Sequence, residues 1–294
     1  MKCFYHNDPD GKCAAYWVGR AHPLPPHDFI PIGYHDAFPL ETIAPNEQVY
    51  IVDFSIPPEE MTQLLQTTPN VTWIDHHKTA MEKYSNYPRP IRGVRLDGIA
   101  ACMLTYCYLN HMTDRGKGDI VPFDILMTKK APMFTKLIAD WDVWKFEYGD
   151  DTRYFQTAFK SLDFTPGSKE WDFMTFYPGK QVKSLIKEGR TMMRYRDQWA
   201  KSYCDARGFA TTFEGHRCYA LNLGLCNSDY FKSVSQEECD MLISFSYDGI
   251  HWHYSLYSQT VDVSEIAKKY GGGGHRGAAG FTWNELLLMK GQSN

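Results

Sequence analysis

The first histidine and the first two acids of the chain are His6, Asp8 and Asp10, which alternate with other residues in the segment HNDPDG. In an extended backbone, side chains at positions i, i+2 and i+4 point to one face. One imidazole and two carboxylates on one face form a surface that binds a divalent cation. Pro9 and Gly11 indicate a turn into a helix whose N-terminal amides would face a bound anion. The alternative is an ordinary turn with Asp as a helix cap.

Two further polar groups directly follow apolar segments. Asp53 comes after the first of these segments, and the triplet of Asp75, His76 and His77 comes after the second. Burying an acid beside two imidazoles is costly unless the groups are paired or bound to a metal. Metal ligation is therefore the favoured interpretation of the triplet, whereas Asp53 taken alone could be a helix cap.

A last pair of acids, Asp140 and Asp142, lies near the end of a predicted helix, and the sequence does not choose between them. Both could be surface carboxylates, although one of them would complete a ligand set. Carboxylates and imidazoles without thiolates suit Mn²⁺, Mg²⁺, Fe²⁺ or Zn²⁺ in an open site. Two such ions about 3.5 to 4 Å apart can activate a water for in-line phosphoryl displacement. The set therefore predicts metal-dependent hydrolysis of a phosphate ester.

Near the C-terminus, the segment GGGGHRGAAG offers a different chemistry. The backbone amides of Gly272, Gly273 and Gly274 can approach a phosphate closely because no side chains intervene. His275 and Arg276 add an imidazole and a guanidinium, and the guanidinium suits phosphate recognition. A flexible linker is the alternative for four glycines. The position between a predicted helix and a predicted strand favours a phosphate cradle that binds substrate.

These residues need elements that bring them together. Segments 2–5, 48–52 and 71–74 are short and apolar, and helical segments separate them. Such a pattern is typical of strands buried on both faces of a mostly parallel sheet. Because ligands bind at the carboxyl ends of such strands, the polar groups above are expected to meet there.

A chain of 294 residues is about twice the usual domain length and predicts two domains of the α/β class. The first, a catalytic domain with the metal site, is expected at 1–180. A connecting helix at 181–204 would join it to a smaller α/β substrate-binding domain at 205–294. Further helices are predicted at 97–112, 129–141 and 263–270, and further strands at 218–222, 241–247, 251–256 and 280–283.

Composition narrows the class of protein. The formal net charge of −4 argues against a protein that coats duplex nucleic acid. No apolar stretch of about 18 residues is present for a membrane span, and the N-terminus lacks the apolar core of a signal peptide. Eight cysteines without a C-x-x-C pair indicate reduced thiols. The expectation is a cytoplasmic protein with a small nucleotide or short oligonucleotide substrate, no stable duplex partner and no membrane, for which a homodimer stays open.

Several motifs resemble the DHH phosphoesterase family, which takes its name from the triplet that appears here at Asp75, His76 and His77. The segment HNDPDG is similar to the first motif of the family, VDFS to the second and IADWD to the fourth. The segment GGGGHRGAAG is similar to the signature of the associated C-terminal domain, although Gly277 stands where many relatives have Asn. The resemblance spans nearly the whole chain.

The resemblance implies a centre of two ions, preferably Mn²⁺, with Mg²⁺ or another divalent cation as the alternative. It lies between two α/β domains, the smaller of which recognises the substrate. In this sequence the resemblance implies that His6, Asp10 and Asp53 hold one ion and that Asp8, Asp53, His76 and either Asp140 or Asp142 hold the other. It further implies that His77 contacts the scissile phosphate, that Asp75 orients a ligating histidine, and that His275 and Arg276 bind the phosphate or terminal nucleotide of the substrate.

The family hydrolyses diverse substrates, which include short oligonucleotides, 3′-phosphoadenosine phosphate, cyclic dinucleotides, single-stranded DNA and polyphosphate. The compact length of this chain disfavours a processive nuclease, which needs further domains to hold a long strand. We expect a hydrolase of short oligonucleotides or small phosphorylated nucleotides. A cyclic dinucleotide phosphodiesterase and a catalytically silent nucleotide-binding or scaffold protein are the alternatives.

Overall fold

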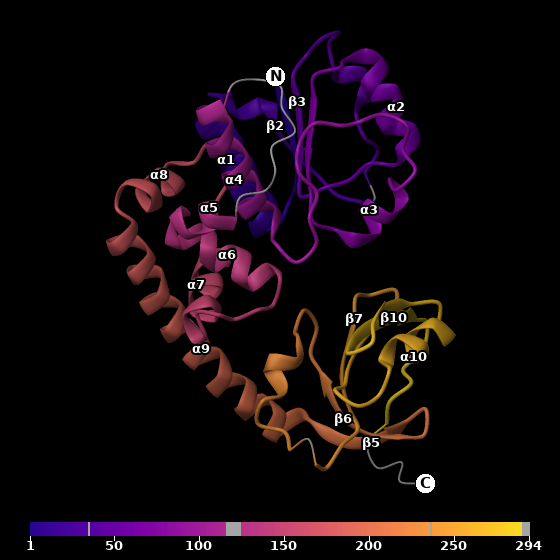
Figure 1. Cartoon of the computed structure of the whole chain (residues 1–294). Coiled ribbons are helices and arrows are strands. Elements are labelled where there is room, and N and C mark those ends of the chain that lie inside the picture. The colour runs from indigo at the N-terminus through magenta and orange to yellow at the C-terminus, as the bar shows by residue number, and fades with distance from the viewer. Residues whose placement is uncertain (35, 116–124, 236, 290–294) are drawn as a thin grey trace. The chain divides into compact units, whose positions relative to one another are not determined.

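The computed structural model describes residues 1–34, 36–115, 125–235 and 237–289 (Figure 1). The chain forms two compact units, Met1–Thr191 and Met192–Asn294. The division between them falls within the long helix α9 (Pro178–Arg207), in the region where the sequence predicts a connecting helix. Within the described ranges, no helix has both the length and the apolar character needed to cross a membrane.

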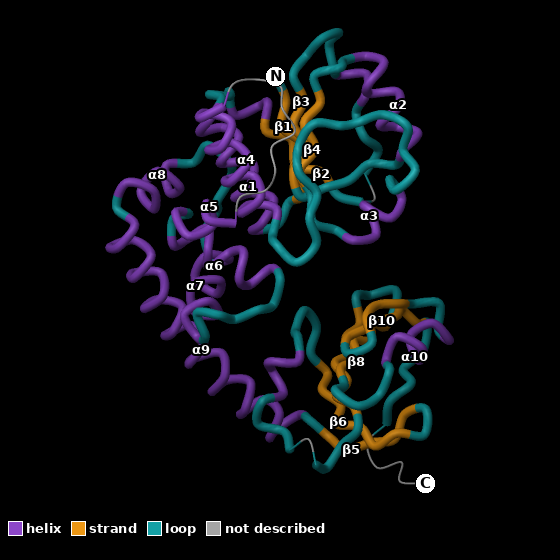
Figure 2. Tube along the Cα trace, in the orientation of Figure 1, coloured by secondary structure: helices purple, strands orange, loops and turns teal. Residues whose placement is uncertain are grey.

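The first unit combines a parallel sheet with helices (Figure 2). Its strands are β1 (Lys2–His6), β2 (Phe29–Ile32), β3 (Val49–Val52) and β4 (Val71–Ile74). Its helices, besides the first part of α9, are α1 (Pro9–Ala21), α2 (Pro58–Thr67), α3 (Lys78–Lys83), α4 (Ala101–Arg115), α5 (Ile125–Lys130), α6 (Met133–Asp142), α7 (Asp150–Lys160) and α8 (Lys169–Phe176).

The four strands lie in the order β2-β1-β3-β4, and every neighbouring pair is parallel. Helices α1 and α4 contact each other and pack against the central strands. Met61 and Leu64 of α2 belong to a separate apolar cluster with Phe4, Ile51 and Trp73, one residue from each of three strands. Both faces of the sheet are therefore covered, which explains why all residues of β3 and β4 are buried and confirms the predicted parallel sheet.

Three differences from the sequence prediction have local causes. Strand β2 is short and contains Pro31, which is tolerated because the strand lies at the edge of the sheet. The helix predicted at 129–141 is interrupted before Pro132, which is the N-cap of α6, because proline disfavours helical backbone in the preceding residue. Helices α7 and α8 occupy an aromatic-rich region with no predicted element, where Phe159 stacks on Phe164 and contacts Trp171.

The second unit is a mixed sheet with one described α-helix besides the end of α9. The strand order is β5-β6-β7-β8-β10-β9, in which only the pair of β6 and β7 is parallel among the described pairs. The combination of this sheet with an α-helix confirms the α/β class predicted for the second unit. The elements are β5 (Phe209–Phe213), β6 (His216–Asn222), β7 (Met241–Tyr247), β8 (Trp252–Tyr257), α10 (Val263–Lys269), β9 (Gly273–His275) and β10 (Ala278–Trp283).

Candidate metal centre

A tight connection between β1 and α1 positions the first three candidate ligands. His6 ends β1, Asp8 caps α1 by accepting a hydrogen bond from the Gly11 amide at 2.9 Å, and Asp10 is buried in the first helical turn. A Cβ atom at Gly11 would lie 2.1 Å from the carbonyl oxygen of His6, so only glycine fits. The extended backbone predicted over His6 to Asp10 is therefore wrong, since these residues converge through a turn from strand to helix.

Asp53 follows β3 directly and is the most constrained member of the site. Its backbone has φ of 54°, a left-handed conformation that is uncommon for residues other than glycine. Its carboxylate is 1% exposed, and neither oxygen has a hydrogen-bond partner among the described residues. Backbone strain and a buried carboxyl group without hydrogen-bond partners at one residue make Asp53 a candidate functional position.

The three residues after β4, Asp75, His76 and His77, make different contacts. The buried Asp75 carboxylate accepts hydrogen bonds from the backbone amides of His76 and His77 at 2.7 and 3.2 Å. The same oxygen lies 2.7 Å from Nδ1 of His77. Asp75 therefore fixes the ring of His77 and the backbone of both histidines, while the His76 ring extends toward other carboxylates.

His76 Nε2 lies close to three carboxylates from three different elements. The distances are 3.2 Å to Asp53 Oδ1, 3.3 Å to Asp142 Oδ2 and 3.8 Å to Asp10 Oδ2. On the other side of Asp53, Oδ2 lies 3.9 Å from His6 Nδ1, and that nitrogen lies 2.8 Å from Asp8 Oδ2. Seven side chains thus meet at the carboxyl ends of β1, β3 and β4, and we call them the acid–imidazole cluster: His6, Asp8, Asp10, Asp53, His76, His77 and Asp142.

Three overlapping sets within this cluster have ligand atoms within 4.8 Å of one another. Asp53 occurs in two of them, as does His76. The sets are His6 with Asp8 and Asp53, Asp53 with His76 and His77, and Asp10 with His76 and Asp142. A shared carboxylate flanked by two ligand sets is the arrangement that a pair of divalent cations requires.

The electrostatics of the cluster support a cation. Burial, together with the neighbouring carboxylates Asp10, Asp8 and Asp142, raises the pKa of Asp53 well above its ordinary value. Burial and the charges of Asp10 and Asp8 likewise raise the pKa of Asp142 to about 9. Two buried and two half-buried acids in one place repel one another unless protons or metal ions compensate them. The orphaned oxygens of Asp53 and the oxygen and nitrogen donors around them therefore fit divalent metal ions.

The two acids of α6 have different environments. Asp142 belongs to the cluster, and its buried Oδ2 has no hydrogen-bond partner within the described chain. Asp140 occurs in none of the three ligand sets found among the described residues. Its carboxylate accepts hydrogen bonds from the amides of Glu147 and Tyr148 at 2.8 and 3.3 Å and from the Thr152 hydroxyl at 2.5 Å. Asp140 therefore organises the loop between α6 and α7.

Tyr34 is a member of the site that the sequence analysis missed. Its ring lies 5.6 Å from that of His6, 6.1 Å from that of His77 and 4.9 Å from that of Phe54, and its side chain is 52% exposed. It follows β2, the strand that was not predicted, and this explains the omission. Recognition of β2 as a fourth parallel strand would have placed residue 34 at the same edge of the sheet.

The glycine-rich segment of the second unit forms a hairpin of β9 and β10, so it is not a linker. A Cβ atom at Gly272 would lie 2.1 Å from the Gly280 oxygen, and one at Gly274, where φ is 145°, would lie 2.5 Å from Ala279 Cα. Both positions therefore require glycine, whereas Gly273 faces open space. His275 and Arg276 are exposed at the end of this hairpin.

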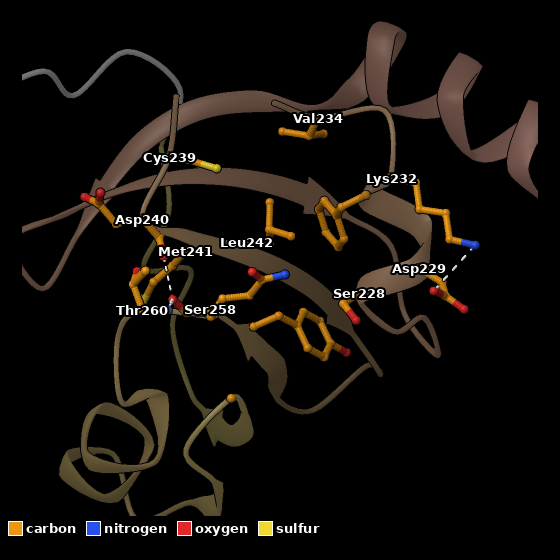
Figure 3. A pocket seen from close by; sticks show the side chains of 14 residues that line it. Ser228, Asp229, Lys232, Val234, Cys239, Asp240, Met241, Leu242, Ser258 and Thr260 are labelled. Atoms are coloured by element: carbon orange, nitrogen blue, oxygen red, sulfur yellow. Dashed lines mark hydrogen bonds and ion pairs between the residues drawn. The ribbon is translucent and has the colours of Figure 1, made fainter. Parts of the chain in front are cut away.

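A pocket of about 390 Å³ lies within the second unit (Figure 3). Its charged side chains are already paired. Lys232 Nζ lies 3.5 Å from carboxylate oxygens of Asp229 and Asp197, and Asp240 forms a 2.8 Å ion pair with Arg217. This pairing leaves little net charge in the pocket for an anionic ligand.

The comparisons with known proteins address the fold. No protein-family model matches the sequence. Protein R106 of Acanthamoeba polyphaga mimivirus, which is uncharacterised, is 25% identical over 253 residues. The match covers 82% of this chain and 54% of R106, so the chain spans about half the length of that relative.

The structure of PggH, the pGpG-specific phosphodiesterase from Vibrio cholerae, matches with a TM-score of 0.50 at 13% identity. The match covers 97% of this chain and 93% of PggH. The chain has a DHH-type fold. The DHH domain of PF0399, a member of the s1p family of ribosomal proteins, matches at 13% identity with a TM-score of 0.45, over 96% of this chain and 82% of that domain. The fold similarity to PggH agrees with the DHH-type architecture predicted from the motifs.

Proposed function

We propose that this DHH-type chain is a metal-dependent phosphoesterase that hydrolyses short oligonucleotides or small phosphorylated nucleotides. The observation that carries the proposal is the Asp53 carboxylate, which is buried between two sets of ligands with both oxygens lacking hydrogen-bond partners among the described residues. Such a carboxylate is costly in a folded protein unless a cation or a proton neutralises it, and a site with several further oxygen and nitrogen ligands favours the cation. Hydrolysis of phosphate esters is the reaction for which an open, oxygen-rich site for two cations is best suited.

We assign the ligands from the geometry of the cluster. His6 and Asp8 would hold one cation, Asp10, His76 and Asp142 the other, and Asp53 would contact both. This places Asp8 and Asp10 in the opposite sets from those that the family resemblance implies. Asp140 would not be a ligand, because its oxygens already accept hydrogen bonds from the following loop.

The bound cations would supply Lewis-acid polarisation of the phosphate and a water of lowered pKa. The chain itself would orient the substrate. Because Asp75 holds Nδ1 of His77, the Nε2 atom of this ring is the nitrogen left to contact an oxygen of the scissile phosphate. In the second unit, exposed Arg276 and His275 would bind a phosphate or terminal nucleotide of the substrate.

The test is hydrolysis of bis(p-nitrophenyl) phosphate by the full chain, first freed of metal and then titrated with Mn²⁺ or Mg²⁺. Release of p-nitrophenol that depends on the metal and is lost in Asp53→Asn supports the proposal. Asparagine is a suitable replacement, because it has nearly the shape of aspartate and tolerates the left-handed backbone at this position. Turnover that is unaffected by a chelator or by Asp53→Asn would overturn the proposal.

A substrate panel would then rank the chemical classes. It includes pGpG, other linear dinucleotides, cyclic dinucleotides, 3′-phosphoadenosine phosphate and longer single strands. The first compound is included because PggH, a solved structure of similar fold, is specific for pGpG. Preference for a linear dinucleotide over a long strand is the expected result.

A further inference from the structure

A cavity of about 650 Å³ in the first unit is not explained by the metal centre. It is formed by the first turn of α4 with the residues before it, by α5, by one side of α6 and by the loop between α6 and α7. Helices α5 and α6 both contact α4, and Figure 1 shows the three together. The volume lies in the range of about 300 to 1,000 Å³ that small-molecule sites occupy.

The cavity borders the acid–imidazole cluster through two shared elements. Ala100 lines the cavity, and the next two amides, of Ala101 and Cys102, donate hydrogen bonds to the Asp10 carboxylate at 2.7 and 3.0 Å. On α6, Ala139 and Val143 line the cavity, and the candidate ligand Asp142 lies between them in sequence. A ligand in the cavity would therefore contact α6, which carries Asp142, and the start of α4, which holds Asp10.

The charges of the cavity suit an anion. Lys129, Lys136 and Lys145 line it, and no carboxylate of the described residues is within ion-pair distance of any of the three ammonium groups. Two acids also line the cavity. Asp140 is engaged with three donors of the adjacent loop, and Glu147 is exposed. This differs from the pocket of Figure 3, where Lys232 and Asp240 already have partners of opposite charge.

The remaining lining is apolar and aromatic. Ile99, Met103 and Val143 contribute aliphatic surface, and Tyr148, 38% exposed, contributes a ring from the loop. A flat, weakly polar group could pack on these side chains while an attached phosphate contacts the lysines. A nucleoside monophosphate combines both properties.

We propose that this cavity, the Lys129–Lys136–Lys145 pocket, binds one nucleoside monophosphate moiety of the substrate next to the metal centre. The proposal rests on the proposed function, because it assigns the substrate of that same site. It makes the catalytic unit itself a determinant of specificity, in addition to any contribution from the glycine-rich hairpin.

The experiment uses the double variant Lys129→Ala/Lys145→Ala in the full chain. Lys136 is left intact because its Nζ donates to the Lys129 carbonyl and supports the local fold. Its matched control is Lys180→Ala/Lys183→Ala, which removes the same charge from exposed positions on α9. Thermal unfolding of both variants first establishes that the fold is retained.

Two measurements keep this proposal distinguishable from the proposed function. The first is binding of AMP in the presence of EDTA, which requires no catalysis. We expect the pocket variant to weaken this binding at least about tenfold, because two charge-assisted contacts are lost, whereas the control leaves it unchanged. Equal affinity in the pocket variant and wild type overturns the pocket, whatever the catalytic result.

The second measurement compares hydrolysis of pApA with that of bis(p-nitrophenyl) phosphate. We expect the pocket variant to raise the KM for the dinucleotide about tenfold and to leave kcat/KM for the small diester within about twofold. An equal loss on both substrates would overturn the pocket, because it would indicate damage to the metal centre. If wild type hydrolyses neither substrate but still binds AMP through the lysines, the proposed function fails and the pocket stands.

Discussion

The acid–imidazole cluster and the glycine-rich hairpin, the two candidate functional regions, differ in backbone conformation and in the burial of their side chains. In the cluster, mostly ordinary backbone brings charged side chains into a buried place where they repel one another. In the hairpin, Gly272 and Gly274 create an unusual backbone, and the candidate substrate-binding side chains of His275 and Arg276 remain exposed. The cluster therefore lowers the stability of the metal-free fold, whereas the glycines of the hairpin stabilise its backbone.

The largest effect is expected from Asp53→Asn. Removing the shared carboxylate should lower kcat/KM for bis(p-nitrophenyl) phosphate by about a thousandfold or more, because several kcal/mol of metal-dependent stabilisation are lost. Steady-state hydrolysis with saturating Mn²⁺ measures this. Asp151→Asn, at an exposed position in α7, serves as the control and should retain wild-type activity. A variant at Asp53 that keeps one tenth of the activity would contradict the role given to this residue.

Asp140→Asn and Asp142→Asn separate an acid that organises a loop from a candidate metal ligand. In the presence of EDTA, Asp140→Asn should lower the free energy of unfolding by about 1 to 3 kcal/mol, because the loop donors lose a charged acceptor. Asp142→Asn should instead stabilise the metal-free protein near neutral pH, since folding no longer requires this carboxyl group, whose pKa burial raises to about 9, to take up a proton. Each kcal/mol corresponds to about 2 to 4 °C in Tm for a unit of this size.

The pH dependence of the free energy of unfolding tests the environment assigned to Asp142. The pKa of Asp142 is raised from 3.8 to about 9 on folding, so the folded state binds more protons than the unfolded state between these values. The free energy of unfolding of the metal-free wild type should therefore fall as the pH rises from about 4 to 9. Asp142→Asn should reduce this slope. Thermal unfolding at several pH values measures it, and an unchanged slope would contradict the raised pKa.

Gly272→Ala and Gly273→Ala test whether the hairpin depends on its backbone. An added Cβ at Gly272 meets the Gly280 oxygen at 2.1 Å and should cost about 1 to 3 kcal/mol of stability. At Gly273 nothing lies within 4 Å of the added atom, and the change should be within about 1 kcal/mol. Urea unfolding of both variants gives the comparison. Equal destabilisation would show that close approach is not the reason for these glycines.

The smallest effect is expected from Arg276→Ala. If the exposed guanidinium binds a substrate phosphate, its loss should raise the KM for a dinucleotide about tenfold with little change in kcat. Arg207→Ala, at an exposed position at the end of α9, is the control of equal charge. A decrease in kcat at unchanged KM would assign Arg276 a different role.

Much of the fold was predictable because periodicity and turn residues specify it locally. Strands β1, β3 and β4 are continuous apolar segments, and the helix over 263–270 is found as α10. Strand β2 was missed because Pro31 and a length of four residues conceal an edge strand. Helices α7 and α8 were missed because their aromatic residues have weak helix propensity and depend on packing with residues far away in sequence.

For the candidate site, too, the local sequence predicts part of the answer and the tertiary structure supplies the rest. The sequence identified the acids and histidines from their motifs, and all seven residues of the cluster were among the candidates. It did not choose between Asp140 and Asp142, because both lie two residues apart near the end of one helix. Only the folded loop that starts at Val143, whose amides reach Asp140, separates an occupied carboxylate from an available one.

The hydrogen bonds between Asp10 and the first turn of α4 couple the acid–imidazole cluster to that helix. A single carboxylate is shared by the positive end of that helix and by the cluster, so the two compete for the same negative charge. Binding of a cation at the cluster would therefore change the hydrogen bonds that the amides of Ala101 and Cys102 donate to Asp10. The hydrogen-exchange rates of these two amides would then report whether cations are bound, and the measurement requires no substrate.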